Sequence, residues 1–314
     1  MTALAKRVEG ALHETRLFIL GVQVLLGIQF NAGLERTTGE LPRISQVLIV
    51  VALVLICVAF GLLILPGSYD RIVMGQMAGP RLTRVITFVI EASPLPVAFV
   101  LAIDAFIVTD RAIGAITGAA LSVATLIVAL SFWYALAIWH RLFRHHIVSA
   151  EREADSASEK PVMVGLEEKI SNVELEARIV LPGNQALLGF QFIGVLLGGF
   201  APLPFVVKIV YVASFGLVAL SISLLMSISP YHRVGERGFA TPNFYRYASR
   251  IITISMVPLG LGVAGDVYIV VYKLFSSQAL AIVIALCLLT FFYALWFGYP
   301  YAHLIYKGRR SCAA

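Results

Sequence analysis

Residues 14–30 read ETRLFILGVQVLLGIQF, and residues 176–192 read EARIVLPGNQALLGFQF. The two stretches share Glu, Arg, Gly, Gln and Leu positions at a constant offset of 162 residues. The offset continues without a gap through further pairs: Tyr69/Tyr231, Arg71/Arg233, Arg84/Arg246, Pro96/Pro258 and Asp104/Asp266. Self-similarity at a fixed period indicates an internal repeat. The sequence therefore predicts a tandem duplication.

The composition is that of a chain that lies in a bilayer. Hydrophobic residues make up 59% and charged residues 13% of the chain, whereas soluble domains carry roughly 25% charge. Apolar runs long enough to cross roughly 30 Å of hydrocarbon lie at 17–34, 44–65, 85–108, 113–139, 179–200, 206–228, 248–271 and 279–304. The runs are continuous, whereas strands of a membrane barrel are shorter and alternate. We predict an all-α integral membrane protein with eight transmembrane helices.

The eight predicted spans divide into two sets of four. Residues 1–143 form the first four-helix repeat, residues 144–172 a charged linker, and residues 173–314 the second repeat. An even number of spans per copy makes both copies enter the membrane in the same direction. We therefore expect parallel repeats related by a pseudo-twofold axis along the membrane normal.

Basic residues predict the orientation. With the N-terminus inside, 19 of the 24 Lys and Arg residues fall on the cytoplasmic side, as the positive-inside rule requires. Both termini and the linker are then cytoplasmic. The net charge of +6 reflects this topology and attraction to anionic lipid headgroups, so the bilayer is the expected partner and nucleic acid is not.

The first helix of each copy carries two polar stripes. At 100° per residue, one stripe holds Arg16, Gln23, Gly27 and Phe30, and the nearly opposite one holds Glu14, Gly21, Leu25 and Gln29. Polar and glycine positions on both sides predict a helix with protein neighbours all round. The glutamines Gln23, Gln29, Gln185 and Gln191 have two interpretations, namely hydrogen bonds between helices or the polar lining of a solute or ion path.

Carboxylates inside predicted spans are the main functional candidates, because ionisable groups there are costly. Asp104 and Asp266 are repeat partners, and Glu91 is present in the first copy alone. We interpret them as ion-coupling residues, with ion pairing near the headgroups as the alternative for the aspartates. Glu91 precedes Ser93-Pro94-Leu-Pro96, where a broken helix would open onto a cavity; it alternatively pairs with Arg84.

A set of charges recurs at the predicted cytoplasmic ends: Glu14, Arg16, Arg71, Arg84, Glu176, Arg178, Arg233 and Arg246. These residues either orient the bundle through ion pairs or form an anion-attracting mouth or inner gate. Aromatic residues at 132–134 and 291–299 are typical of a belt at the membrane interface. Nucleotide-binding loops, nucleophile elbows and metal-ligand spacings do not occur in the sequence, so we expect no enzyme, no cofactor and no metal.

The Glu-x-Arg and Gly-x-Gln-x-Leu-x-Gly motifs, together with Pro230-Tyr231-His232-Arg233, resemble a bacterial four-span membrane family. The family is classed as a domain of unknown function, and some members carry the label sodium:proton antiporter. Each half of the chain is similar to one such domain, including an aspartate late in the third helix. The first copy departs from the pattern at Asp70, where the family has histidine. The resemblance implies a multi-pass protein of the bacterial cytoplasmic membrane.

Three classes of function stay open, of which a membrane-embedded enzyme comes last because the sequence shows no recognisable nucleophile or metal set. The first is a secondary transporter or ion pathway, coupled to a cation or proton, in which the two halves rock about a site near their interface. The second is a non-transporting accessory or scaffold subunit, whose partner is a second copy of the chain or another membrane protein.

Overall fold

The described part of the chain is entirely helical. The computed structural model describes residues 3–74, 80–135, 165–228 and 241–311, and these ranges contain no strand. The first copy consists of α1 (Ala3–Leu34), the 3-10 turn η1 (Arg36–Glu40), α2 (Arg43–Tyr69), α3 (Pro80–Ala92), α4 (Pro94–Ala112) and α5 (Ala115–Leu130). The second consists of α8 (Leu166–Leu196), α9 (Phe205–Met226), α11 (Pro242–Phe275), α12 (Gln278–Tyr293) and α13 (Tyr299–Ser311). The all-α prediction is confirmed.

Most of the predicted spans are long apolar helices. By length and composition, six segments could cross a membrane: Arg43–Val73, Arg84–Arg111, Lys169–Leu196, Phe205–Met226, Pro242–Phe275 and Gln278–Tyr306. Two shorter apolar helices, Phe18–Leu34 and Ala115–Leu130, fall on the predicted spans 17–34 and 113–139. The total of eight spans stays a prediction.

The first helix of the second copy extends to the N-terminal side of residue 173, where we predicted the repeat to begin. Helix α8 begins at Leu166, inside the predicted linker 144–172. Ile170 and Val173 at its start are buried in one cluster with Phe244 of α11, because apolar residues three or four apart share one face of a helix. The linker up to residue 164 lies outside the described residues.

The third helix differs between the copies. In the first copy it is divided at Ser93 into α3 and α4, and in the second it is the unbroken α11, which contains Pro258. Ser93 keeps helical angles (φ −68°, ψ −30°), and its N–H donates to the Val89 carbonyl at 2.9 Å. The helical backbone therefore continues through Ser93, although Pro94 and Pro96 have no N–H to pair with the Ile90 and Ala92 carbonyls. Neither the cavity beside Arg71 nor the groove between α2 and α12 is lined by this segment.

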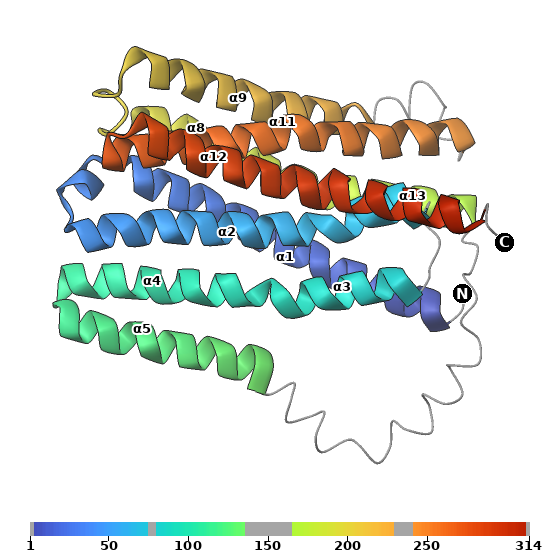
Figure 1. Ribbon diagram of the computed structural model, residues 1–314, viewed down its shortest axis with the longest axis horizontal. Coiled ribbons are helices and arrows are strands. Elements are labelled where there is room, and N and C mark those ends of the chain that lie inside the picture. Colours follow the sequence, from blue (N-terminus) through green and yellow to red (C-terminus); the bar gives the residue numbers. More distant parts are fainter. Residues whose placement is uncertain (1–2, 75–79, 136–164, 229–240, 312–314) are drawn as a thin grey trace.

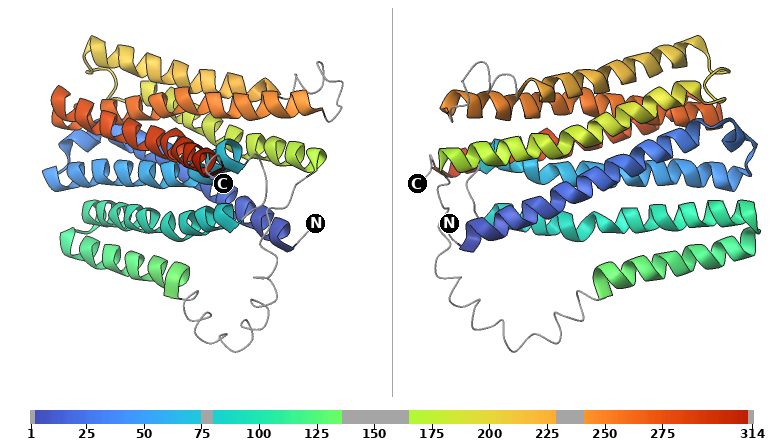
Figure 2. Two further views of the ribbon diagram at one scale, coloured as in Figure 1. Left: turned by 45° about the vertical axis from the view of Figure 1, so that its right-hand side comes forward. Right: turned by 180° about the vertical axis from the view of Figure 1, so that it is seen from behind.

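Six helices form a row in which neighbours contact one another (Figure 1). From one edge of the molecule to the other, the order is α5, α4, α2, α12, α11, α9. The row thus runs through the fourth, third and second helices of the first copy and then through the same helices of the second copy. The first helices, α1 and α8, lie side by side behind the row and run in the same direction (Figure 2).

This order corrects the predicted pseudo-twofold axis. A twofold would place α2 opposite α9, and α5 opposite α12. Instead α2 contacts α12, while α5 and α9 lie at opposite edges of the molecule (Figure 1). The copies are arranged head to tail, with different faces of the same four-helix unit in contact.

A buried aromatic cluster joins the two copies. The Phe292 and Trp296 rings are stacked with centroids 4.8 Å apart, and Phe60 of α2 meets both edge-on. The Trp296 indole N–H donates to the Gly61 carbonyl at 3.0 Å, and Trp296 is fully buried. The predicted interfacial belt is therefore wrong for Trp296, which packs between the copies because Gly61 leaves room for rings there.

Candidate functional site

Each copy holds one aspartate of its third helix against one glutamine of its first helix. In the first copy the Gln29 Nε2 donates to both carboxylate oxygens of Asp104, at 2.7 and 2.8 Å. In the second the Gln191 Nε2 donates to both oxygens of Asp266, at 2.9 and 2.8 Å. The sequence predicted all four residues as candidates, and the structure brings them together as two equivalent Gln–Asp pairs.

The pair in the second copy is enclosed. Asp266 is 4% exposed and Gln191 is fully buried. The Tyr211 hydroxyl of α9 donates to the Gln191 carbonyl, and α11, which carries Asp266, contacts α1 and α2 of the first copy. Helices of both copies thus surround this carboxylate, so the second pair lies beside the interface between the copies.

The pair in the first copy is more open. Gln29 is 3% exposed, but Asp104 is only half-buried. Ile49 occupies the position that Tyr211 has in the second copy. Helix α4 packs on α2, α3 and α5, all of its own copy, whereas α11 also contacts α1 and α2 of the first copy. The same two residues therefore lie in unequal surroundings.

A glutamine amide suits either protonation state of its aspartate. The NH2 group donates to an ionised carboxylate, as it does in both copies. The amide oxygen accepts from a protonated carboxyl once the amide turns over. In the second copy the Gln191 Oε1 is buried without a hydrogen-bond partner among the described residues. The Gln–Asp pair can therefore take up a proton, or a small cation between its oxygens.

The other two glutamines do not reach a carboxylate. Gln23 is fully buried, and its Nε2 donates to the Asn184 Oδ1 at 2.7 Å across the contact of α1 with α8. Asn184 in turn donates to the Ser221 Oγ at 3.3 Å. Gln185 is exposed. Gln23 thus joins helices, which is the first of its two predicted interpretations.

Glu91 lies apart from both Gln–Asp pairs. Its side chain is exposed, and 13 residues of helix, about 20 Å, separate it from Asp104. The Tyr134 hydroxyl donates to the Glu91 carbonyl at 2.6 Å, so its backbone joins the third helix to the fourth. Arg84 is exposed as well.

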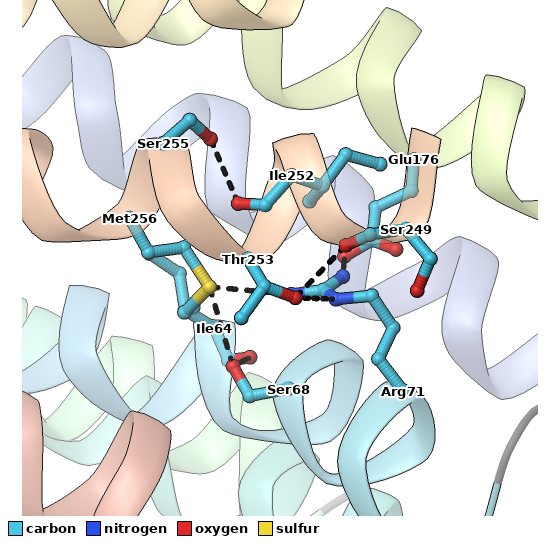
Figure 3. A network of polar contacts seen from close by, with 9 residues as sticks. All are labelled: Ile64, Ser68, Arg71, Glu176, Ser249, Ile252, Thr253, Ser255 and Met256. Atoms are coloured by element: carbon cyan, nitrogen blue, oxygen red, sulfur yellow. Dashed lines mark hydrogen bonds and ion pairs between the residues drawn. The ribbon is translucent and has the colours of Figure 1, made fainter. Parts of the chain in front are cut away.

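A second polar cluster joins the copies at the end of the bundle where α1 and α8 begin. Arg71 forms an ion pair with Glu176 of α8, and the side chains are 2% and 15% exposed. As Figure 3 shows, Arg71 also donates to the Thr253 Oγ1 at 3.3 Å and contacts the Met256 sulfur at 3.2 Å. Beside it lies a cavity of about 40 Å³, which Asn172 also lines, with room for a few water molecules.

The remaining predicted charges do not join this cluster in the part of the chain that is described. Arg246 is exposed and donates to Asn243 of its own helix at 3.0 Å. The other four, Glu14, Arg16, Arg178 and Arg233, lie outside the residues whose side chains are described. Of the eight predicted charges, the structure brings together Arg71 and Glu176.

Sequence reasoning missed a lysine at the opposite end of the bundle. Lys273, near the end of α11, donates to the carbonyl of Gly33 in the last turn of α1, at 2.9 Å, and to that of Glu35 just after it. A cation suits the C-terminal end of a helix, where carbonyls are unpaired. The sequence does place Lys273 at the end of an apolar run, which indicates a role at a helix end. That position does not reveal which helix the lysine caps.

The comparison with known families matches both copies. The model of a family of unknown function (DUF6328) matches residues 2–137 and again residues 167–300. The chain belongs to this family. It contains two DUF6328 units in tandem, which confirms the duplication. No curated protein matches, and no solved structure matches.

The two DUF6328 units account for the equivalent placement of the Gln–Asp pairs. Each pair has its glutamine and aspartate 75 residues apart, so one unit carries one pair. Across the described ranges, no three side chains of His, Cys, Asp or Glu come together as ligands of a metal would.

Proposed function

We propose that the chain is an eight-span protein of the bacterial cytoplasmic membrane, with both termini cytoplasmic, that moves a proton or a small cation as a secondary transporter. Six helices with the length and composition of membrane spans support the location. The excess of Lys and Arg on one side of the predicted spans supports the orientation.

One observation carries the transport proposal, namely a Gln–Asp pair inside the apolar helices of each copy. A carboxylate within a membrane helix is costly, about 2.5–3.5 kcal/mol at the centre of the helix on insertion scales and less towards its ends. A single amide donor does not replace the hydration that such a group has in water. Reversible binding of an ion would give a reason for keeping Asp104 and Asp266 in both copies.

The chemistry of the pair favours a proton or a small hard cation. Carboxylate and amide oxygens are hard ligands, which suit such cations. In the second copy these ligands are Asp266 and the unpartnered Gln191 Oε1. Neither pair contains a sulfur or imidazole ligand, so a softer metal ion is not the substrate that we propose.

Transport can be measured with the purified chain in liposomes that contain a pH-sensitive dye. We expect gradients of Na+ or K+ to drive proton movement, and Asp266→Asn with Asp104→Asn to reduce it to the level of empty liposomes. Glu91→Gln is the matched control, because it removes an exposed carboxylate from the same helix as Asp104. Its activity should equal that of the unaltered chain.

Two results would contradict the proposal. In one, the unaltered chain moves neither protons nor cations. In the other, the double Asn variant keeps full activity while its elution in size-exclusion chromatography shows that it is folded.

The accessory or scaffold function remains the second candidate, and the cavities favour it. The cavity beside Arg71 is not lined by either Gln–Asp pair. An apolar groove of about 520 Å³ between α2 and α12, lined by Val54 and Val283 among others, does not reach them either. A different membrane protein that copurifies at fixed stoichiometry, together with absence of transport, would select this function.

A further inference from the structure

The contact between the copies leaves one face of each copy open. Phe30 and Leu34 of α1 are fully buried, because α8, α9 and α11 cover this face of the first copy. The equivalent residues of α8, Phe192 and Leu196, are 62% and 73% exposed. The face that the first copy buries is therefore uncovered in the second.

Residue pairs that meet across the contact between the two copies have equivalents, by the offset of 162 residues, on the two outer faces of the chain. A Cβ on Gly27 would overlap the Phe190 ring, so this ring fills the space over the glycine. The equivalent pair is Gly189 of α8 and Ile28 of α1. Gly189 has no atom within 4 Å of its Cβ position, and Ile28 is 47% exposed.

A second pair shows the same pattern. A Cβ on Gly183 would overlap the Gln23 amide, and the equivalents are Gly21 and Gln185. Both are exposed, and the Cβ position of Gly21 is also empty within 4 Å. A pseudo-twofold would bring Gly21 and Gln185 together within one chain, whereas a head-to-tail arrangement brings them together between chains.

The capping lysine has an unused equivalent too. Lys273 donates to the Gly33 carbonyl at the end of α1. Its equivalent in the first copy is Arg111, which is exposed at the end of α4. The carbonyl equivalent to that of Gly33 belongs to Val195, which is 43% exposed at the end of α8. Arg111 thus keeps the positive charge of Lys273, but the C-terminal end of α8 that it would cap would have to come from another chain.

We propose that a second copy of the chain binds head to tail, with its α1, α4 and α5 face against the α8 and α9 face of the first. This contact repeats the one between the copies within a chain. A contact between two different faces leaves one face of each kind free at the ends of the assembly. Further chains can therefore bind in the same way, and the assembly either closes into a ring or extends as an open row.

The proposed assembly also covers the more open Gln–Asp pair. Within the chain, α11, which carries Asp266, contacts α2 of the first copy, which carries the buried Cys57. The equivalent helix for Asp104 is α9 of the neighbouring chain, with Ala219 at the position of Cys57. Both aspartates are then enclosed to the same extent.

Disulfide crosslinking tests the contact in native membranes. Ile28→Cys and Gly189→Cys are made on separate, differently tagged chains, in which Cys287 and Cys312 are replaced by Ala and the buried Cys57 is kept. We expect an oxidant to join the two tagged chains to each other, and a chain with both substitutions to form a ladder of oligomers. The control pair is Phe99→Cys with Leu261→Cys, equivalent residues that are exposed in both copies, at 41% and 37%; it should give no ladder.

Other occupants of the open faces give other results. If lipid or an unrelated protein covers them, the Ile28→Cys and Gly189→Cys chains stay separate while a Gly27→Cys, Phe190→Cys chain crosslinks internally. If the doubly substituted chain forms its disulfide within one polypeptide, the copies are related by a twofold. Either result overturns the proposal.

A bulky substitution provides a test that does not depend on disulfides. Gly189→Trp places a ring where no atom lies within 4 Å, so the single chain should fold normally. We expect it to convert the assembly into chains of 34.1 kDa, as measured by native mass spectrometry, while Leu261→Trp leaves the assembly intact. An unaltered chain that is monomeric in lipid nanodiscs would contradict the proposal.

Discussion

In the Gln191–Asp266 pair the aspartate lies on α11, which contacts helices of both copies, whereas in the Gln29–Asp104 pair, made of the same residues at the same spacing, the aspartate lies on α4, which packs on helices of its own copy. Asp266 is 4% exposed and Asp104 is half-buried. The difference teaches that two identical residues at the same spacing are buried to different extents when different helices pack on them.

The largest effect should come from disturbing the contact that creates this difference. In Gly183→Leu the new side chain overlaps the buried Gln23 amide, and overpacking of this kind costs about 3 kcal/mol. Gly21→Leu is the matched control, since its Cβ position is empty and it gains the same helix propensity. The midpoint temperature of thermal unfolding, measured in detergent at a concentration where the chain is monomeric, should be lowered by Gly183→Leu and not by Gly21→Leu. Equal midpoints would mean that the two copies do not differ here.

An intermediate effect is expected at the aspartates. Compared with Asp266→Asn, which removes the charge but keeps an acceptor oxygen, Asp266→Ala leaves the buried Gln191 amide without an acceptor and should be less stable by about 2 kcal/mol. Asp104→Ala should cost less than half of that, because water reaches its half-buried site. Asn at either position keeps an acceptor oxygen and should restore most of the loss. Equal losses for the two Ala variants in the same unfolding measurement would remove the distinction between the pairs.

The smallest effect concerns the hydroxyl that the first copy lacks. Tyr211→Phe removes the hydrogen bond to the Gln191 carbonyl and should cost about 1 kcal/mol. Tyr293→Phe serves as the control, because its hydroxyl donates to the Val257 carbonyl at 2.9 Å in a more accessible position. If the two variants unfold at the same temperature, Tyr211 does not contribute to the enclosure of the second pair.

The sequence was sufficient for the residues of the Gln–Asp pairs but not for their pairing. Duplication identified Asp104 and Asp266 as equivalent, and the cost of buried charge made them candidates. Which glutamine meets each aspartate depends on how the first and third helices are rotated against one another, and apolar runs without a clear polar face do not determine that rotation.

The two polar stripes of the first helix were predicted correctly in one respect. Gln23 and Gly27, on one stripe, both face α8, and Gln29, on the other, faces α4. The helix therefore has protein neighbours on both sides. Gly21, on the second stripe, is exposed within the chain. Periodicity predicted that this residue lies on that face of the helix, but it does not predict which element covers the face.

The predicted twofold was wrong because equal sequences do not require equal contacts. The Phe292 ring lies over Gly61, but their equivalents are Leu130 and Ser223, a smaller side chain without a ring and a position with a side chain. A large residue in one copy that faces a glycine in the other was the available signal. This signal can be recognised only if the contact between the copies is assumed to join two different faces of the four-helix unit.

The two copies are fastened at opposite ends of the bundle, by Arg71 with Glu176 at one end and by Lys273 with the last carbonyls of α1 at the other. Shear or tilting of one half against the other would break a bonded cation at each end. Alternating access through a hinge between the halves is therefore disfavoured. Conformational change requires less disruption inside a single copy, where Ser93 already divides the third helix of the first copy into α3 and α4.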